Sequence, residues 1–378
     1  MSGVERCDIC GIPAMVSKEL NWEDNGTISL KRSPSTRMVF FESASIDELF
    51  LGIEKLIGFS IVNLVIESKA RDTRGYVERL LTPAASGFLP EEWRGGKGEM
   101  NHMTEDQKAA SLAVIKSVTQ NMTDLSRIYG YGDQRLGESW DSGEDYPWRL
   151  QVYHNPYSLL FAAADNLGAG EVFEKTEMWV RWENMGGGTY NIVVYPGKHP
   201  IDLKERLRTK RYEMKPGDIA YERCSGCGLP QEVANLEYSL EDGTYVNPDT
   251  GWRMAIFGPA PLDAIFNDLE TELGEAIPEA VIEAQRRYIK YAWGVERWNR
   301  SGATFQKMIA VRGLGNQVEF EGNGDHLSMR IENSCLHLPM IGTIQALVEL
   351  AYRADSSRVE WELEDHGDLS LTIHVKRS

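Results

Sequence analysis

The chain has 378 residues, of which 42% are hydrophobic, and its formal net charge is −17 at pH 7. This length exceeds the roughly 250 to 300 residues that one hydrophobic core usually supports, so we expect two domains. The sequence contains no run of about 18 apolar residues, which a membrane-spanning helix would need. The acidic charge argues against nucleic acid, because phosphate binding requires a basic face. We therefore expect neither a membrane nor a nucleic acid as a partner.

The beginning of the chain and its cysteines indicate the compartment. The first seven residues, Met1 to Cys7, lack the apolar segment of a signal peptide, which predicts a cytoplasmic protein. In that compartment the five cysteines are expected to be reduced thiols or metal ligands and not structural disulfides.

A Cys-x-x-Cys-Gly-x-Pro motif occurs twice in the chain. It supplies Cys7 and Cys10 in the first instance and Cys224 and Cys227 in the second. Thiolates at this spacing bind one ion from a single turn, so two motifs supply the four ligands of one site. We predict a structural zinc site made by these four cysteines. Rubredoxin-like iron, a redox dithiol and plain buried cysteines are the alternatives.

The similarity between the two parts of the chain continues beyond the cysteines. Arg37-Met38 recurs as Arg253-Met254, and this offset of 216 residues holds without a gap to Arg71 and Arg287. Further on the offset is shorter, so the first copy carries 33 extra residues, which we place between about 77 and 125. The predicted domains are a first copy at 1–200, a connector at 201–221 and a second copy at 222–378. We expect pseudo-two-fold symmetry to bring the cysteine motifs together.

Each copy is predicted to begin with two helices. Apolar residues recur at helical spacing over 45–58, where Ser45 and Glu48 suggest a capping box, and again over 262–273. In the helix that follows, Glu67 and Arg71, matched by Glu283 and Arg287 in the second copy, stand four residues apart and are expected to form a surface pair. A pair buried against a ligand cavity is the alternative.

The later half of each copy has the alternating pattern of half-buried strands. A single helix fits within 155–170 in the first copy and within 333–352 in the second. Helices followed by antiparallel strands predict an α+β fold in which the helices of each copy pack on its sheet. The predicted strands lie around 150–152, 178–182, 190–194, 329–331, 359–361 and 369–373.

This pattern resembles the 4-vinyl reductase-like, or hydrocarbon-binding, domain family. The residues that carry the resemblance are Arg312 to Glu319 and Leu327 to Ser334, with a looser match at Tyr129 to Gln134 and Leu150 to Pro156. The resemblance implies an α+β domain that encloses an apolar cavity for an aromatic compound. Members of that family often hold zinc with a cysteine near a Gly-Asp pair. Gly367-Asp368 has no such cysteine, so that metal site is not carried over.

Four residues of the first copy are candidates for contact with a ligand: Trp148, His154, Tyr157 and Phe161. Aromatic rings at these positions could line a pocket for a planar apolar molecule, although aromatic residues at such spacing more often belong to the core. His154 and Tyr157 are also the candidates for a catalytic role. The alternative for His154 is a histidine that caps the next helix or bonds to the backbone.

The leading hypothesis is a cytoplasmic protein that binds a hydrophobic, aromatic or polycyclic small molecule and whose two copies are joined by the metal site. An enzyme, or enzyme subunit, of aromatic or tetrapyrrole metabolism is the first alternative, with the first-copy pocket as its site. An assembly factor whose acidic surface docks a protein partner is the second. The sequence leaves open whether the protein is an enzyme.

Overall fold

The computed structural model describes residues 4–84, 104–137, 149–201, 203, 213–301, 305–323, 326–364 and 367–376. The chain forms two compact units. Unit 1 comprises Met1–Ile61, Arg208–Ser239 and Tyr245–Ser378, and unit 2 comprises Val62–Leu207 and Leu240–Thr244. Helices and antiparallel sheets make up both units, which confirms the predicted α+β class. Each unit contains chain from both predicted copies, and the boundaries of the copies stay a prediction about the sequence.

A six-stranded sheet has the order β1-β2-β3-β10-β9-β8. At its centre, β3 and β10 pair in antiparallel fashion, with Phe40 opposite Ile256. We did not predict this sheet, because four of its strands are only three residues long and show no alternation. Its strands are β1 (Leu20–Trp22), β2 (Ile28–Leu30), β3 (Ser33–Glu42), β8 (Glu237–Ser239), β9 (Thr244–Val246) and β10 (Arg253–Phe257).

The sheet has two halves, β1-β2-β3 and β8-β9-β10, and along the chain each half is preceded by a short helix and followed by a longer one. The short helices are α1 (Ala14–Glu19) and α7 (Gln231–Ala234), and the longer ones are α2 (Ala44–Ile57) and α8 (Ala260–Leu273). The predicted apolar stripes are confirmed, and the rings of Phe50 and Phe266 lie 6.5 Å apart. The predicted capping box is wrong. Ser45 donates its hydroxyl hydrogen to the carbonyl of Glu42 instead, at 2.7 Å.

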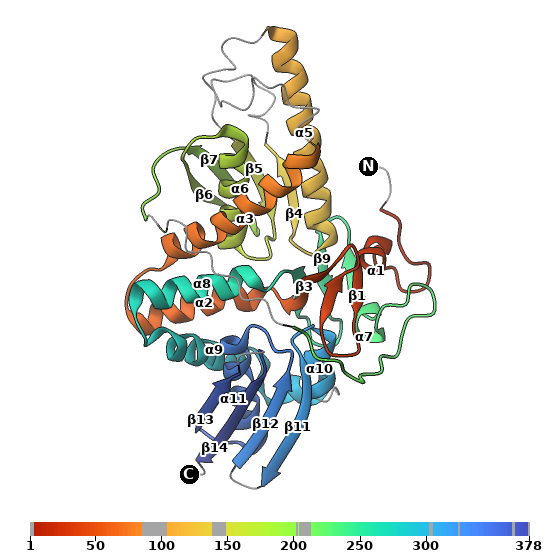
Figure 1. The fold of residues 1–378 in the computed structure, drawn as a ribbon, viewed down its shortest axis with the longest axis vertical. Coiled ribbons are helices and arrows are strands. Elements are labelled where there is room, and N and C mark those ends of the chain that lie inside the picture. The colour runs from red at the N-terminus through yellow and green to blue at the C-terminus, as the bar shows by residue number, and fades with distance from the viewer. Residues whose placement is uncertain are drawn as a thin grey trace. The chain divides into compact units, whose positions relative to one another are not determined.

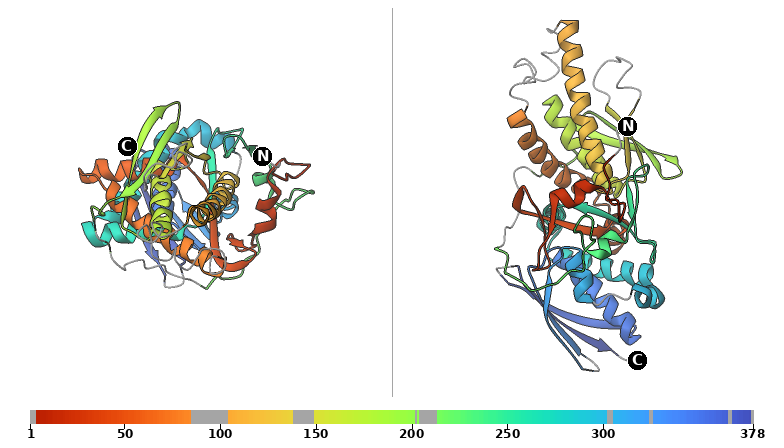
Figure 2. Two further views of the ribbon diagram at one scale, coloured as in Figure 1. Left: turned by 90° about the horizontal axis from the view of Figure 1, so that it is seen from above. Right: turned by 90° about the vertical axis from the view of Figure 1, so that its right-hand side faces the viewer.

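The remainder of unit 1 is a four-stranded antiparallel sheet with the order β11-β12-β14-β13, covered by helices (Figure 1). The right-hand view of Figure 2 shows α11 lying along one face of the blue strands, and α9 packs on α11. The elements are α9 (Ile277–Ser301), α10 (Phe305–Val311), β11 (Asn316–Asn323), β12 (His326–Glu332), α11 (His337–Tyr352), β13 (Ser356–Leu363) and β14 (Leu369–Lys376).

Unit 2 has a sheet of the corresponding order, β4-β5-β7-β6. In Figure 1, α6 lies against β6 and β7, and α3 packs on α6. The 24 residues of α5 follow α3, where unit 1 has the seven residues of α10 after α9. Residues 105–125 of the predicted insertion lie in α5. The part of the insertion at 85–103 lies outside the described residues. The elements are α3 (Val62–Ala84), α5 (Glu105–Ile128), β4 (Asp133–Leu136), β5 (Arg149–His154), α6 (Leu159–Glu174), β6 (Met178–Gly186) and β7 (Thr189–Pro196).

The backbone has the same unusual φ values at corresponding points of the two four-stranded sheets and their helices. Asn155 after β5 and Asn333 after β12 have φ values of 49° and 52°, in the left-handed region that few residue types adopt readily. Lys175 and Arg353, which end α6 and α11, have φ values of 50° and 52°. Strained positions thus recur at matching places in the two units.

The predicted pair of Glu67 and Arg71 does not form. Glu67 is buried and contacts Arg74 and His199, whereas Arg71 donates to the carbonyl of Leu203. In unit 1 the equivalent prediction is confirmed, since Arg287 meets Glu283 at 2.6 Å. Glu67 on α3 is buried and Glu283 on α9 is not, which explains the difference. A buried carboxylate needs cationic partners and pairs with those nearest to it, whatever their spacing in the sequence.

Among the described helices, none combines the length and apolar character needed to cross a bilayer.

Candidate metal centre and ligand pocket

The two cysteine motifs adopt the same tight turn in unit 1. In the first, the amide of Gly11 donates to the carbonyl of Cys7 at 2.8 Å, and in the second that of Gly228 donates to Cys224 at 2.9 Å. Each glycine has a positive φ, 74° and 76°, which lets the chain reverse directly after the second cysteine. Both sulfur atoms of a motif therefore lie on the same side of its turn.

The four sulfur atoms converge. The Sγ atoms of Cys7 and Cys224 are 3.9 Å apart and those of Cys10 and Cys227 are 3.6 Å apart. All four lie within 4.8 Å of one another. Four sulfurs at about 2.3 Å from a tetrahedral zinc ion are about 3.8 Å apart, so the donor set fits one four-coordinate ion. The structure therefore brings together the residues predicted as metal ligands into a cluster that could bind a metal.

The electrostatic environment of the thiols is uneven. Hydrogen bonds from the backbone amides of Cys10 and Ile9 lower the pKa of Cys7 to about 7. Burial raises the pKa of Cys10 and of Cys227. Several thiolates this close together require a cation to balance their charge. The fifth cysteine, Cys335, is buried elsewhere, and burial raises its pKa to about 12.

Among the described residues that are predicted to contact a ligand, the structure places only two, Tyr157 and Phe161, in contact with each other. Tyr157 and Phe161 are buried together at the start of α6, with ring centroids 6.0 Å apart, and Tyr131 stacks on Tyr157 at 4.1 Å. His154, at the end of β5, bonds through Nδ1 to the hydroxyl of Thr189 at 3.0 Å. The helix is capped by Ser158 and not by His154. Trp148 lies outside the described residues.

Next to this aromatic cluster is a buried charged group that the sequence analysis missed. The ammonium of Lys69 on α3 donates to Asp165 on α6 at 2.6 Å and to the hydroxyl of Thr73 at 2.9 Å. Burial alone would lower the pKa of Lys69, but Asp165 and Asp72 raise it above its usual value. The lysine interrupts the apolar face formed by Ile66 and Ala70, a signal that the sequence contains.

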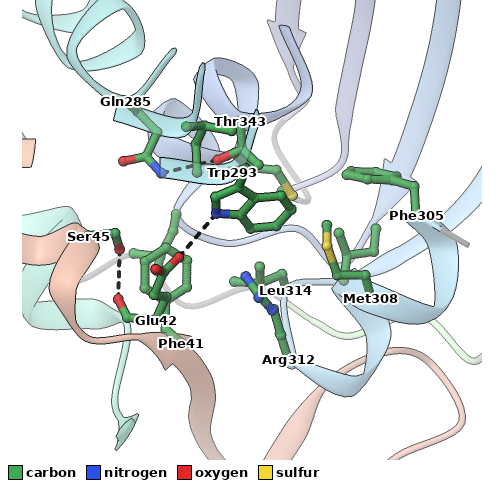
Figure 3. A pocket seen from close by; sticks show the side chains of 14 residues that line it. Phe41, Glu42, Ser45, Gln285, Trp293, Phe305, Met308, Arg312, Leu314 and Thr343 are labelled. Atoms are coloured by element: carbon green, nitrogen blue, oxygen red, sulfur yellow. Dashed lines mark hydrogen bonds between the residues drawn. The ribbon is translucent and has the colours of Figure 1, made fainter. Parts of the chain in front are cut away.

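A pocket lies in unit 1 between α9, α10 and the end of β3 (Figure 3). Trp293 is at its centre, with its indole nitrogen donating to Glu42 at 3.3 Å. The amide of Gln285 donates to Thr343 at 3.2 Å, so α9 and α11 are linked at its rim. The cavity volume is about 20 Å³, enough for about one water molecule. The apolar residues of its wall include Phe41, Phe305, Met308, Leu314 and Met340.

Arg312 brings a positive charge to this pocket, which Glu42 also lines. The residue is 9% exposed, and its guanidinium lies 5.5 Å from the ring centre of Trp293 and 5.8 Å from that of Trp252. The two indoles stack on each other at 4.0 Å. Burial lowers the pKa of Arg312, and the carboxylate of Glu42 partly offsets this effect. In the sequence, Arg312 contributes to the family resemblance but is not a predicted site residue.

Comparison with known proteins does not place this chain in a family. No family model matches it. Human inducible nitric oxide synthase is 26% identical over 235 residues, which cover 58% of this chain and 19% of that protein. The chain thus spans about a fifth of the length of that relative. An H-NOX protein from K. algicida, crystallised in the unliganded Fe(II) state, gives a TM-score of 0.22 at 12% identity, with 39% of this chain and 85% of the other covered.

Proposed function

We propose that the protein is a small-molecule-binding protein held together by one structural zinc ion, which Cys7, Cys10, Cys224 and Cys227 bind. The convergence of the four sulfur atoms within 4.8 Å supports this proposal. Four thiolates fill the coordination sphere of zinc, so the ion stabilises the fold and leaves no position for a substrate. Iron would fit the same four sulfurs, and metal analysis separates the two.

We also infer that the chain is an internal duplication. The beginnings of its two copies are related by a local two-fold axis within unit 1. Residues that the sequence repeat aligns lie opposite their own counterparts, as they must at such an axis. Cys7 faces Cys224, Phe40 pairs with Ile256, and Phe50 contacts Phe266. The metal site would then tie together the beginnings of the two copies.

The proposed ligand is hydrophobic, in keeping with the resemblance to the hydrocarbon-binding family. The pocket around Trp293 favours unit 1 as its location, because aromatic and aliphatic side chains form most of its wall. A ligand larger than a water molecule must displace side chains, and Met308 and Met340 are unbranched residues that can move. Tyr157 and Phe161 would then belong to the core of unit 2.

Native mass spectrometry with elemental analysis tests the metal site. We expect one zinc ion per chain, and replacement of Cys7 and Cys224 by serine should abolish binding. Cys335→Ala is the matched control, because this cysteine is buried away from the cluster and should leave the metal content unchanged. A metal-free wild-type protein purified under reducing conditions would overturn the proposal.

A further inference from the structure

Arg312 is a buried cation whose guanidinium has no direct polar partner in the part of the chain that the structure describes. Among the described residues, none accepts a hydrogen bond from it and no carboxylate comes within 4 Å of it. Burial of a charge is costly unless the charge is paired. The two indoles of Trp252 and Trp293 offset part of that cost by cation–π attraction.

Glu42 lies at the same pocket but is already engaged. Its two carboxylate oxygens accept from the hydroxyl of Tyr288 at 3.1 Å and from the indole of Trp293 at 3.3 Å. The attraction between Glu42 and Arg312 therefore acts across the pocket and not through a contact. In Figure 3, Arg312 extends toward Trp293 at the middle of the pocket. Its side chain is thus part of the pocket wall.

We propose that the pocket of unit 1 binds an organic acid, with Arg312 as the residue that holds its carboxylate. A guanidinium donates two parallel hydrogen bonds to a carboxylate, a geometry that an ammonium or an amide does not offer. The cavity has the size of one small polar group, and the apolar wall formed by Phe41, Leu314 and Met340 suits the hydrocarbon part of the ligand. This inference rests on the proposed binding function and names the charge of its ligand.

The backbone at Arg312 is held in place by a hydrogen bond. The residue directly precedes Gly313, and the backbone carbonyl of Arg312 accepts a hydrogen bond from the amide of Phe40 at 2.9 Å. The backbone at Arg312 is thus fixed against β3, which limits the positions that its guanidinium can reach. This restriction lowers the entropic cost of ordering the side chain around an anion.

Isothermal titration calorimetry with benzoate and its neutral analogue benzamide tests the inference, at constant ionic strength. We expect benzoate to bind at least tenfold more tightly than benzamide, and acetate to bind more weakly than benzoate. Arg312→Gln should remove the preference for benzoate, and Arg312→Lys should retain only part of it. Arg358→Gln is the control for lost charge, because Arg358 is 72% exposed on β13.

The outcomes separate this inference from the function on which it rests. Equal binding of benzoate and benzamide would overturn the role of Arg312 but would support an apolar pocket. Binding of neither would overturn both. Benzoate binding that chloride or sulfate matches in strength, or that persists in Arg312→Gln, would also overturn the inference. Arg312→Met provides a check on folding, since it keeps the packing against the indoles and should not lower the melting temperature.

Discussion

His199 lies between two carboxylates in unit 2, which makes it a strongly perturbed histidine. Its Nε2 meets Glu171 at 2.5 Å and its Nδ1 contacts Glu67, so both ring nitrogens face an acceptor. Arg74 contacts both carboxylates as well, at 2.6 and 3.2 Å. Burial alone would lower the pKa of His199, but Glu171 and Glu67 raise it to about 9. The folded protein therefore holds the imidazolium at neutral pH.

The stability of unit 2 should depend on this proton. A histidine in the unfolded chain has a pKa of about 6.5, so the stabilising contribution is complete below that value and is lost as the pH rises through about 9. We expect the free energy of unfolding to fall by about 1–2 kcal/mol over this window, after allowance for solvent screening. Calorimetry at a series of pH values would measure the loss as the difference between wild type and His199→Gln.

A matched variant isolates that effect. His374→Gln changes an exposed histidine on β14 and should keep the pH profile of the wild type. The interpretation of His199 would be wrong if the His199→Gln protein lost stability with the same pH dependence as the wild type.

At the scale of the element, the packing of α11 on α9 depends on a residue without a side chain. A Cβ atom added at Gly342 would lie 2.3 Å from the carbonyl oxygen of Ile282, closer than such atoms approach. The contact is with backbone, so α9 cannot relieve it by a change of rotamer. The pocket around Trp293 lies along the same pair of helices, and its rim bond between Gln285 and Thr343 requires them to stay close.

Gly342→Ala should therefore destabilise the protein. The overpacking outweighs the gain of about 1 kcal/mol in helix propensity, and we expect a net loss of about 1–3 kcal/mol in urea unfolding. Gly170→Ala in α6 is the comparison, because the nearest atoms to the added Cβ are in side chains, Cγ1 of Val194 at 3.0 Å and Sδ of Met178 at 3.5 Å. Its expected effect is below about 1 kcal/mol, and equal losses in the two variants would contradict this account.

Sequence patterns predicted long elements and missed short strands. A long element shows its own periodicity, whereas a short strand depends on the strand with which it pairs. The stripe of Ile46, Leu49 and Phe50 predicted α2, because a 14-residue helix shows several turns of periodicity. The three residues of β1 show none, and its role depends on pairing with a strand that no local pattern specifies. The cysteine cluster was predictable because the ligands occur in a repeated motif. The surroundings of Arg312 were not predictable, because two indoles and a carboxylate from distant parts of the chain create them.

At the scale of the molecule, the two units differ in how the chain builds them. Unit 1 collects three separate stretches of chain, whereas unit 2 is almost continuous. The cysteine motifs lie in two of the three stretches of unit 1, so a metal ion there would link segments more than 200 residues apart. A cross-link across so long a loop removes much of the entropy of the unfolded chain.

Removal of the metal should therefore loosen unit 1 and leave unit 2 folded. We expect hydrogen exchange to rise by at least tenfold in β1, β2 and the two cysteine turns when a chelator strips the ion, because their order depends on its coordination. Peptides from β4 to β7 should keep their protection, since those strands pair within unit 2. Equal loss of protection in both units would show that the ion stabilises the whole chain cooperatively. Unchanged exchange in the cysteine turns would show instead that their hydrogen bonds, and not the metal, hold the sulfurs together.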